Sequence, residues 1–503
     1  MRLAELTSAD RARAFQGDID IAGIATDSRA VQPGYLFAAL SGSKTDGAQY
    51  IEDALSRGAA ALLVSPKVMR NCPLLSDNSR VAVIVDSNPR RRLARIAARF
   101  YGPQPEIAVA VTGTNGKTSI VDFTRQIWLA LGRKAASIGT LGVLGDCRIA
   151  AETYVHTTPP PEILYSQLAA LATQGVTHVA VEASSHGLAQ YRLDGMQLRA
   201  AALTNIARDH LDYHADERAY MYAKLRLFGE VLAPGGAAVL SREAEVFSEA
   251  ESLSWARGQQ IVSVGGRFGD LRLLSCEVAG ERQHLRIGLG TREWEIDLAL
   301  PGRFQAMNAL MAAALVISCG EDPEDVFGVL PALVAVPGRL ELVGKTSLGA
   351  PVFVDYAHTP DALRAVLETV RPHCRGRLRL VFGCGGDRDR GKRPMMGAVA
   401  QQLADEIYVT DDNPRSEQPE TIRAAICAQC PSARDLDDRR GAIALAISEM
   451  GADDLLVIAG KGHETGQQFS DRTEPFDDRL VAADCLAAEA VKNADRGGAH
   501  EHS

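Results

Sequence analysis

The sequence has no apolar run that approaches the ~20 residues of a membrane-spanning helix. Its Met1 end has no apolar core of a signal peptide. Positive charge is not in excess, since the net charge is -9, and general nucleic-acid binding prefers a basic surface. We therefore expect no membrane insertion and no nucleic-acid partner, and acidic ligands would need local basic pockets.

Regular cysteine spacing is also lacking. The chain has 9 cysteines, an odd number, which favours reduced thiols and a cytoplasmic protein. Cys427 and Cys430 form a single C-x-x-C pattern in an Ala/Ile-rich helical stretch without a second ligand pair. A buried helix face is therefore a better interpretation than a redox or zinc site.

The length of 503 residues is too great for one core and favours about three domains. Alternating strand and helix signals predict α/β domains. We expect a small α/β amino-terminal domain, a central parallel-sheet, P-loop ATPase-like domain and a carboxy-terminal Rossmann-like domain. The predicted boundaries are residues 1–102, 103–336 and 337–492, followed by a polar tail at 493–503 that we expect to be disordered.

The most informative segment is Ala108 to Ser119, which reads AVAVTGTNGKTS. A strand-like run, a glycine turn and a helix start follow one another, as in loops that cradle phosphates. Lys117 would supply charge and the Thr118 hydroxyl could reach a magnesium ion. Val111 stands where the general pattern has its first glycine. The predicted phosphate-binding residues are Gly113, Thr114, Asn115, Gly116, Lys117, Thr118 and Ser119.

Two polar clusters follow later strands of the central domain. Glu182 comes directly after a strand predicted at 177–181, where a carboxylate near a phosphate loop is a natural magnesium ligand. A segment dense in His and Asp, from Thr204 to His214, follows the next strand. Lys224 lies in a helical stretch further on.

In the last domain, three polar loops follow predicted strands: Gly383 to Asp389, Asp411 to Arg415, and Gly460 to Glu464. In open parallel sheets, ligands bind at the carboxyl ends of strands. We therefore expect a ligand site formed by these loops.

The sequence TGTNGKTS resembles the phosphate loop of the Mur ligases of peptidoglycan synthesis and of their folylpolyglutamate-forming relatives. The resemblance extends over nearly the whole chain and implies an ATP-dependent ligase. It implies catalytic roles for Lys117, Lys224, Glu182, His210 and Arg339. It also implies Mg²⁺ held by Thr118, Glu182, His210 and Lys224, the last carbamylated to N6-carboxylysine.

The resemblance assigns three substrate sites. ATP would contact the phosphate loop, Asn308, Arg339, Asp355 and His358; Gln305 stands where the family often has Asn. A UDP-N-acetylmuramoyl dipeptide would be bound by Thr26, Ser28, Ser43, Lys44, Thr45, His156, Thr157, Thr158, Ser184, Gln190 and Arg192. The amino acid would be bound by Arg388, Asp412, Asn413, Pro414, Arg415, Gly460 and Glu464.

The sequence Asp412-Asn413-Pro414-Arg415 indicates which amino acid is used. In the family member that adds the third stem-peptide residue, this motif marks meso-diaminopimelate as substrate. Arg415 and Arg388 suit its distal carboxylate, and Glu464 suits its ammonium group.

The reaction implied is phosphoryl transfer from ATP to a dipeptide carboxylate, followed by attack of an amine on the acyl phosphate. We expect a monomer. Two alternatives stay open: a lysine-adding member of the same family, which Arg415 argues against, and a nucleotide-binding switch module, which would leave the later loops unused.

Overall fold

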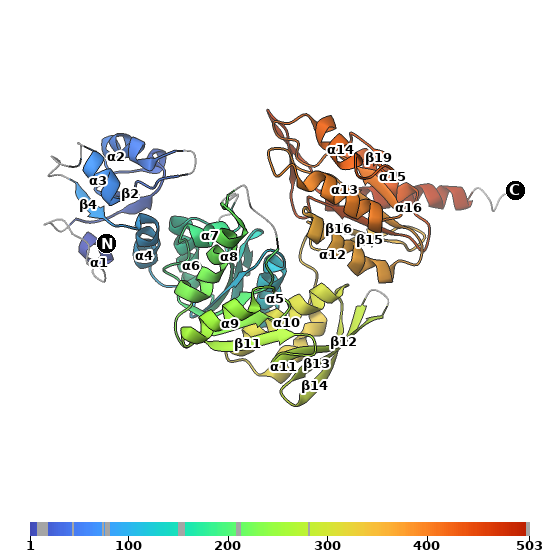
Figure 1. The fold of residues 1–503 in the computed structure, drawn as a ribbon, viewed down its shortest axis with the longest axis horizontal. Coiled ribbons are helices and arrows are strands. Elements are labelled where there is room, and N and C mark those ends of the chain that lie inside the picture. The colour runs from blue at the N-terminus through green and yellow to red at the C-terminus, as the bar shows by residue number, and fades with distance from the viewer. Residues whose placement is uncertain are drawn as a thin grey trace.

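A computed structural model describes residues 1–7, 19–42, 45–72, 75, 81–148, 156–207, 213–279 and 282–498. The chain forms three lobes, with the amino- and carboxy-terminal lobes at opposite ends of a central one (Figure 1). In the described part of the chain, no helix combines the length and apolar character needed to cross a bilayer.

The amino-terminal lobe is a parallel sheet of order β1-β2-β3-β4. Its longest described helix is rich in arginine and begins at Pro89, with the Asn88 side chain accepting a hydrogen bond from the amide of Arg91. It ends at Gly102, whose φ of 95° few other residues tolerate. The elements are β1 (Gly23–Ala25), β2 (Tyr35–Ala38), β3 (Ala61–Val64), β4 (Ala82–Val85), α1 (Leu3–Thr7), α2 (Ile51–Ser56), α3 (Pro66–Asn71) and α4 (Pro89–Tyr101).

The central lobe is a 10-stranded sheet of order β14-β13-β12-β11-β10-β9-β5-β8-β6-β7. Strands β9, β5 and β8 at its middle are parallel, and β5 and β8 are apolar almost throughout, as burial on both faces requires. The strands are β5 (Ile107–Thr112), β6 (Ala135–Gly139), β7 (Gly142–Gly145), β8 (His178–Glu182), β9 (Leu198–Leu203), β10 (Ala237–Ser241), β11 (Gln260–Gly265), β12 (Leu271–Ala279), β13 (Arg282–Leu289) and β14 (Arg292–Leu298).

Helices cover the central sheet: α5 (Lys117–Ala130), α6 (Pro161–Thr173), α7 (Ser185–Ala189), α8 (Glu217–Arg226), α9 (Phe247–Ala256), α10 (Arg303–Ser318) and α11 (Pro323–Val329). The expected parallel sheet is present, but the prediction did not include all of its strands. Strands β12, β13 and β14 pair antiparallel and extend one edge, which the sequence reasoning did not anticipate.

The carboxy-terminal lobe has a sheet of order β15-β16-β20-β17-β18-β19, parallel except for β15. Its strands are β15 (Glu341–Lys345), β16 (Pro351–Asp355), β17 (Leu378–Phe382), β18 (Glu406–Val409), β19 (Arg434–Asp435) and β20 (Leu455–Ala459), with a hairpin of β21 (Gly466–Gln468) and β22 (Thr473–Pro475). Its helices are α12 (Pro360–Val370), α13 (Lys392–Leu403), α14 (Pro419–Cys427), α15 (Arg439–Ser448) and α16 (Asp478–Gly498).

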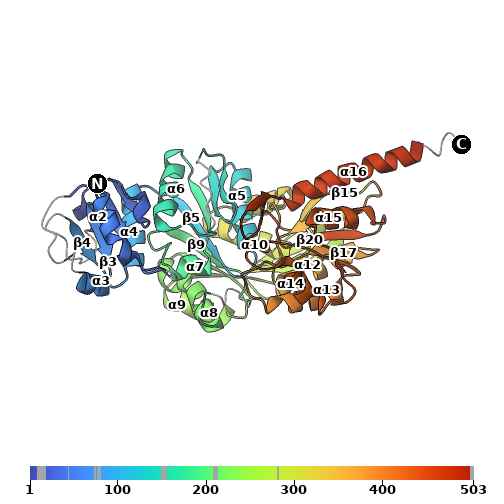
Figure 2. The ribbon, with the colours of Figure 1, turned by 90° about the horizontal axis from the view of Figure 1, so that it is seen from above.

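Helix α16 projects beyond the carboxy-terminal lobe (Figure 2). It runs to Gly498, past the domain end predicted at residue 492, so 493–498 is helical rather than disordered. Its Ala, Glu, Lys and Arg content favours a helix even without close packing.

Candidate active site between the central and carboxy-terminal lobes

The predicted phosphate loop connects β5 to α5 at the carboxyl end of the central sheet. Gly113 and Gly116 have φ values of 146° and 84°. A Cβ on Gly113 would lie 1.8 Å from the Thr204 hydroxyl oxygen, so only glycine permits this approach. Lys117 Nζ donates to the carbonyls of Gly113 and Thr114, both at 2.8 Å, and thus folds over the loop.

Glu182, at the end of β8, lies against the start of α5. Its Oε2 accepts hydrogen bonds from the hydroxyls of Thr118 at 3.1 Å and Thr140 at 3.2 Å. Its Oε1 accepts from the amide of Thr140 at 2.8 Å. A buried carboxylate beside a hydroxyl and a phosphate loop is a donor set that suits Mg²⁺, which usually keeps several waters and binds substrate phosphates.

Lys224 on α8 reaches the same loop. Its side chain is buried, and Nζ donates to the Gly113 carbonyl at 2.6 Å and lies 4.5 Å from the centre of the Tyr220 ring. The predicted ligand His210 lies outside the described residues. Within those that are described, no group of three or more His, Cys, Asp or Glu side chains is arranged to hold a metal.

Arg339 approaches the phosphate loop from the carboxy-terminal lobe. Its Nη2 donates to the Thr118 hydroxyl at 3.2 Å. A cavity of about 210 Å³ opens between the two lobes here, and its walls include Gly116, Thr118, Asn308, Arg339, Asp355 and His358. The structure therefore brings together predicted nucleotide residues from both lobes.

Asp355 closes the β16 side of this cavity. Its carboxylate accepts hydrogen bonds from the amides of Leu340 and Ala357, both at 2.7 Å. Burial raises the pKa of Asp355 to about 6, and the positive charge of Arg339 and the two amides only partly offset that rise.

The central-lobe residues predicted for the UDP-muramoyl dipeptide lie close to Glu182, whose backbone carbonyl accepts a hydrogen bond from the Thr158 hydroxyl at 2.7 Å. Arg192 donates to the Thr158 carbonyl and, at 2.9 Å, to Gln190 Oε1. The hydroxyl oxygens of Thr158 and Ser184 lie 3.0 Å apart. The Thr140 hydroxyl donates to the Thr157 hydroxyl oxygen at 3.2 Å.

The rest of that predicted set is more dispersed. Thr26 donates to Glu162 Oε1 at 2.5 Å, which ties the amino-terminal lobe to α6. Ser28 is buried, whereas Thr45 and His156 are exposed. Ser43 and Lys44 lie outside the described residues.

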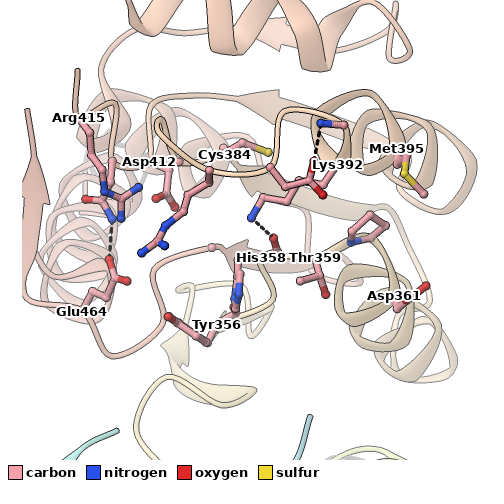
Figure 3. Close-up of a pocket in the computed structure, with 18 residues that line it drawn as sticks. Tyr356, His358, Thr359, Asp361, Cys384, Lys392, Met395, Asp412, Arg415 and Glu464 are labelled. Atoms are coloured by element: carbon pink, nitrogen blue, oxygen red, sulfur yellow. Dashed lines mark hydrogen bonds between the residues drawn. The ribbon is translucent and has the colours of Figure 1, made fainter. Parts of the chain in front are cut away.

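The three predicted loops of the carboxy-terminal lobe line a second cavity, of about 280 Å³. In Figure 3, Arg415, Asp412 and Lys392 lie on one side of it, Tyr356 and His358 on the other, and Glu464 at one end. Arg388, Asn413 and Gly460 also line it. Of the predicted set, Pro414 does not reach the cavity wall.

Arg415 is held in a defined orientation. It has a φ of 54°, its Nη1 donates to the Gly386 carbonyl at 2.8 Å, and its Nε donates to Gln468 Oε1 at 3.1 Å. Asn413 Nδ2 donates to Glu464 Oε2 at 2.8 Å. A cationic and an anionic group thus face the same cavity, as a zwitterionic ligand requires.

Family models match all three lobes: "Mur ligase family, catalytic domain" at residues 20–101, "Mur ligase middle domain" at 111–316, and "Mur ligase, glutamate ligase domain" at 338–462. The chain belongs to the Mur ligase family. It is 48% identical over 497 residues to the UDP-N-acetylmuramoyl-L-alanyl-D-glutamate–2,6-diaminopimelate ligase of Bradyrhizobium diazoefficiens, covering 98% of this chain and 100% of that one.

Solved structures agree with this family membership. A UDP-N-acetylmuramoyl-L-alanyl-D-glutamate–2,6-diaminopimelate ligase is similar with a TM-score of 0.67 and 31% identity, covering 93% of this chain and 95% of that one. The Mycobacterium tuberculosis folylpolyglutamate synthase, solved with ADP and AMPPCP, has a TM-score of 0.62 at 23% identity, covering 74% and 92%. The latter likeness concerns the fold. The predicted family and three-lobe fold class are confirmed.

Sequence reasoning missed a fully buried lysine in this Mur ligase. Lys461 Nζ donates to Asn413 Oδ1 at 3.0 Å, Glu464 Oε2 at 3.3 Å and the Gly466 carbonyl at 2.7 Å. It therefore holds in place Asn413 and Glu464, two residues that were predicted to bind the amino acid. Its position between two glycines in the Gly460 to Glu464 loop was the available signal.

Gln305, noted only as a departure from the family pattern, joins the lobes of this Mur ligase. It is buried on α10, donates to the Arg339 carbonyl at 3.2 Å, and accepts from Asn308 Nδ2 at 3.1 Å. The longer side chain allows both contacts at once.

All nine cysteines are free thiols. Of the pair expected on one helix face, Cys427 is the last residue of α14 and Cys430 lies in the turn after it. Cys430 is buried and Cys427 half-buried, and burial raises the pKa of both thiols, which keeps them protonated and unreactive.

Proposed function

We propose that this Mur ligase uses ATP to join meso-2,6-diaminopimelate to UDP-N-acetylmuramoyl-L-alanyl-D-glutamate in peptidoglycan precursor synthesis. The observation that carries the proposal is that two adjacent cavities share Tyr356 and His358 in their walls, one cavity between the lobes and one within the carboxy-terminal lobe. One holds the phosphate loop and Arg339, and the other holds Arg415, Asp412 and Glu464. The substrate follows from the names of the relatives and from the charges of the second cavity.

The first step transfers the γ-phosphoryl group of ATP to a carboxylate of the dipeptide, giving an acyl phosphate and ADP. Lys117 and Arg339 approach the transferring group from opposite lobes and offset its negative charge. The backbone amides at the start of α5 contribute in the same direction.

Magnesium would be held by Thr118 and Glu182, with His210 and carbamylated Lys224 as further ligands. When bound, the metal would neutralise charge on the phosphates. Lys224→Ala should inactivate the enzyme, and formate or acetate at high concentration should restore part of the activity by replacing the lost carboxylate. A crystal structure of fully active wild-type enzyme that shows an unmodified Lys224 ammonium would contradict the carbamate.

In the second step, one amine of diaminopimelate attacks the acyl carbon, an amide bond forms and phosphate leaves. Arg415 would pair with the distal carboxylate and Glu464 with the distal ammonium. Lysine has no carboxylate to offer Arg415, which would stay unpaired in a half-buried position. Loss of a partner from a buried charged pair costs about 2–5 kcal/mol, so lysine should be used at least ~30-fold less efficiently.

The experiment is a phosphate-release assay with purified protein, omitting each substrate in turn. Release should require ATP, the UDP-muramoyl dipeptide and diaminopimelate together. A lysine-adding ligase would prefer lysine in the same assay. A nucleotide switch would hydrolyse ATP without either co-substrate, but that function leaves the second cavity unexplained.

Arg415→Ala separates the two ligase functions. It should remove most activity with diaminopimelate and change the residual activity with lysine little. Equal loss with both amino acids would show that Arg415 does not read the distal carboxylate. We further propose that the enzyme works as a monomer in the cytoplasm, where nucleotide substrates and free thiols coexist.

A further inference from the structure

Tyr356 and His358 line both cavities. Both residues lie on the short loop between β16 and α12. Tyr356 is half-buried, so its ring forms part of the wall that separates the nucleotide cavity from the amino-acid cavity. None of the roles assigned so far uses this side chain.

One face of the Tyr356 ring supports Arg339. The guanidinium carbon of Arg339 lies 4.5 Å from the ring centre, which is a cation–π arrangement. The same guanidinium donates to Thr118 in the phosphate loop. The ring is therefore placed to keep Arg339 turned toward the phosphates.

Two histidines hold the ring in place. The rings of His358 and His463 lie 4.6 Å and 5.0 Å from it. A Cβ on Gly462 would come within 2.7 Å of the Tyr356 Cβ, so glycine at 462 permits the close approach of the Gly460 to Glu464 loop. That loop also carries Glu464 of the amino-acid cavity.

Tyr356 also lines the amino-acid cavity, together with Arg415, Asp412 and Glu464. Figure 3 shows the side chain opposite Arg415 and Asp412, on the same side as His358. Burial raises the pKa of Tyr356 to about 12, with a further rise from the negative charge of Glu464. The phenol therefore stays protonated at neutral pH and can donate a hydrogen bond to a bound carboxylate or accept one from a bound ammonium.

We propose that Tyr356 is a positioning residue that serves both half-reactions: its ring orients Arg339 for phosphoryl transfer, and its hydroxyl orients the incoming amino acid. The inference rests on the proposed ligase function. Because one rigid side chain forms both contacts, loss of the ring should disturb both substrates, whereas loss of the hydroxyl should disturb the amino acid alone.

The test compares Tyr356→Phe with Tyr356→Leu in steady-state kinetics. Y356F keeps the ring, so the KM for ATP should stay within about twofold, while the KM for diaminopimelate rises about five- to tenfold, as expected for one hydrogen bond. Y356L should raise the KM for both substrates, by about fivefold or more for ATP, because the cation–π contact is lost.

Trp294→Leu is the matched control. Arg292 lies over the Trp294 ring at 5.1 Å on β14, which borders neither cavity, so both KM values should stay unchanged. Titration of a non-hydrolysable ATP analogue without amino acid gives a readout that needs no turnover. The affinity for this nucleotide should fall in Y356L and stay unchanged in Y356F and Trp294→Leu.

The outcomes separate the inference from the function. If wild-type protein shows no phosphate release that depends on diaminopimelate, the proposed function fails. If it does, and Y356L changes the KM of only one substrate or Y356F changes that of ATP, the dual role of Tyr356 is overturned. If Y356L does not fold, the Y356F pattern decides alone.

Discussion

The two junctions between the three lobes are built from different chemistry. At the first, one continuous apolar core contains Leu36 and Leu63 of the amino-terminal lobe, Leu93 of α4, and Val179 and Leu203 of the central sheet. At the second, the central and carboxy-terminal lobes keep separate cores. Among the residues that the structure describes, Phe304 of α10 is the one apolar side chain of the central lobe that packs onto the other lobe's core.

The polar contacts also differ between the two junctions: buried ion pairs join the first, and hydrogen bonds beside a cavity join the second. At the first, buried Asp194 pairs with Arg91 of α4 at 3.0 Å and Arg226 of α8 at 2.5 Å. At the second, Gln305 donates to the Arg339 carbonyl, and Arg339 donates to the Thr118 hydroxyl. These hydrogen bonds connect the two lobes beside the nucleotide cavity. A junction that buries apolar surface keeps its geometry, whereas a polar junction can open to admit substrates and close for reaction. We therefore expect the first junction to govern stability and the second to govern activity.

The largest effect is expected at the polar junction. Lys117→Ala removes the phosphate-loop charge and should lower ATP turnover by at least ~100-fold, as for other lost transition-state contacts. The melting temperature should hardly change, because Lys117 is only half-buried and donates to the carbonyls of Gly113 and Thr114 in its own loop. Near-normal turnover in a folded variant would remove the phosphate loop from the mechanism.

At the apolar junction, Asp194→Ala should act on stability instead. It removes the carboxylate that pairs with both Arg91 and Arg226, while Glu230 stays 3.2 Å from Arg226. Lost hydrogen bonds to charged groups typically cost about 1.5–3 kcal/mol of unfolding free energy. Chemical denaturation measures the loss, and turnover per folded molecule should change little. The control is Glu324→Ala, which breaks an exposed pair with Arg292 and should cost below about 1 kcal/mol. Equal losses for the two variants would contradict the comparison.

Asp355 gives the polar junction a pH dependence. Its folded pKa of about 6 exceeds the ordinary value of 3.8, so between these values the folded state keeps a proton that the unfolded state has released. This stabilisation is full below pH 3.8 and is lost as the pH rises through 6, an effect of up to about 3 kcal/mol.

The measurement is the unfolding free energy of wild type and Asp355→Asn from pH 4.5 to 7.5. The wild type should lose stability relative to the variant as the pH rises, whatever the variant's baseline. Exposed Asp361→Asn is the control. A wild-type-to-variant difference that is independent of pH would show that Asp355 is not buried as described.

The smallest effect is expected from Gln305→Ala. It removes the hydrogen bonds to Asn308 and to the Arg339 carbonyl, so the KM for ATP should rise by about five- to tenfold and kcat should change less. Ser318→Ala, at the far end of the same helix, is the control, because its hydroxyl bonds only within α10. Unchanged ATP affinity would mean that the two lobes are aligned by other contacts.

Much of this molecule was predictable because its signals are local. The sequence around Gly113 to Ser119 predicted a strand, a glycine turn and a helix start, which the structure shows, and the polar loop predicted at Gly383 to Asp389 does follow a strand, β17. The antiparallel strands β12 to β14 were missed. Strand β13 alternates buried and exposed residues only in part, and neighbouring strands decide which of its faces is covered.

The sequence by itself determined the order of the lobes, the family and the candidate ligand loops at the ends of strands, since each depends on residues close together in the chain. Only the tertiary structure decided which loops share a cavity. Lys224 meets the Gly113 carbonyl, Gln305 meets Arg339, and Lys461 locks Asn413 because the folded sheets bring distant segments within hydrogen-bonding distance. These contacts join residues that are far apart in the sequence, so the spacing of residues along the chain does not predict them.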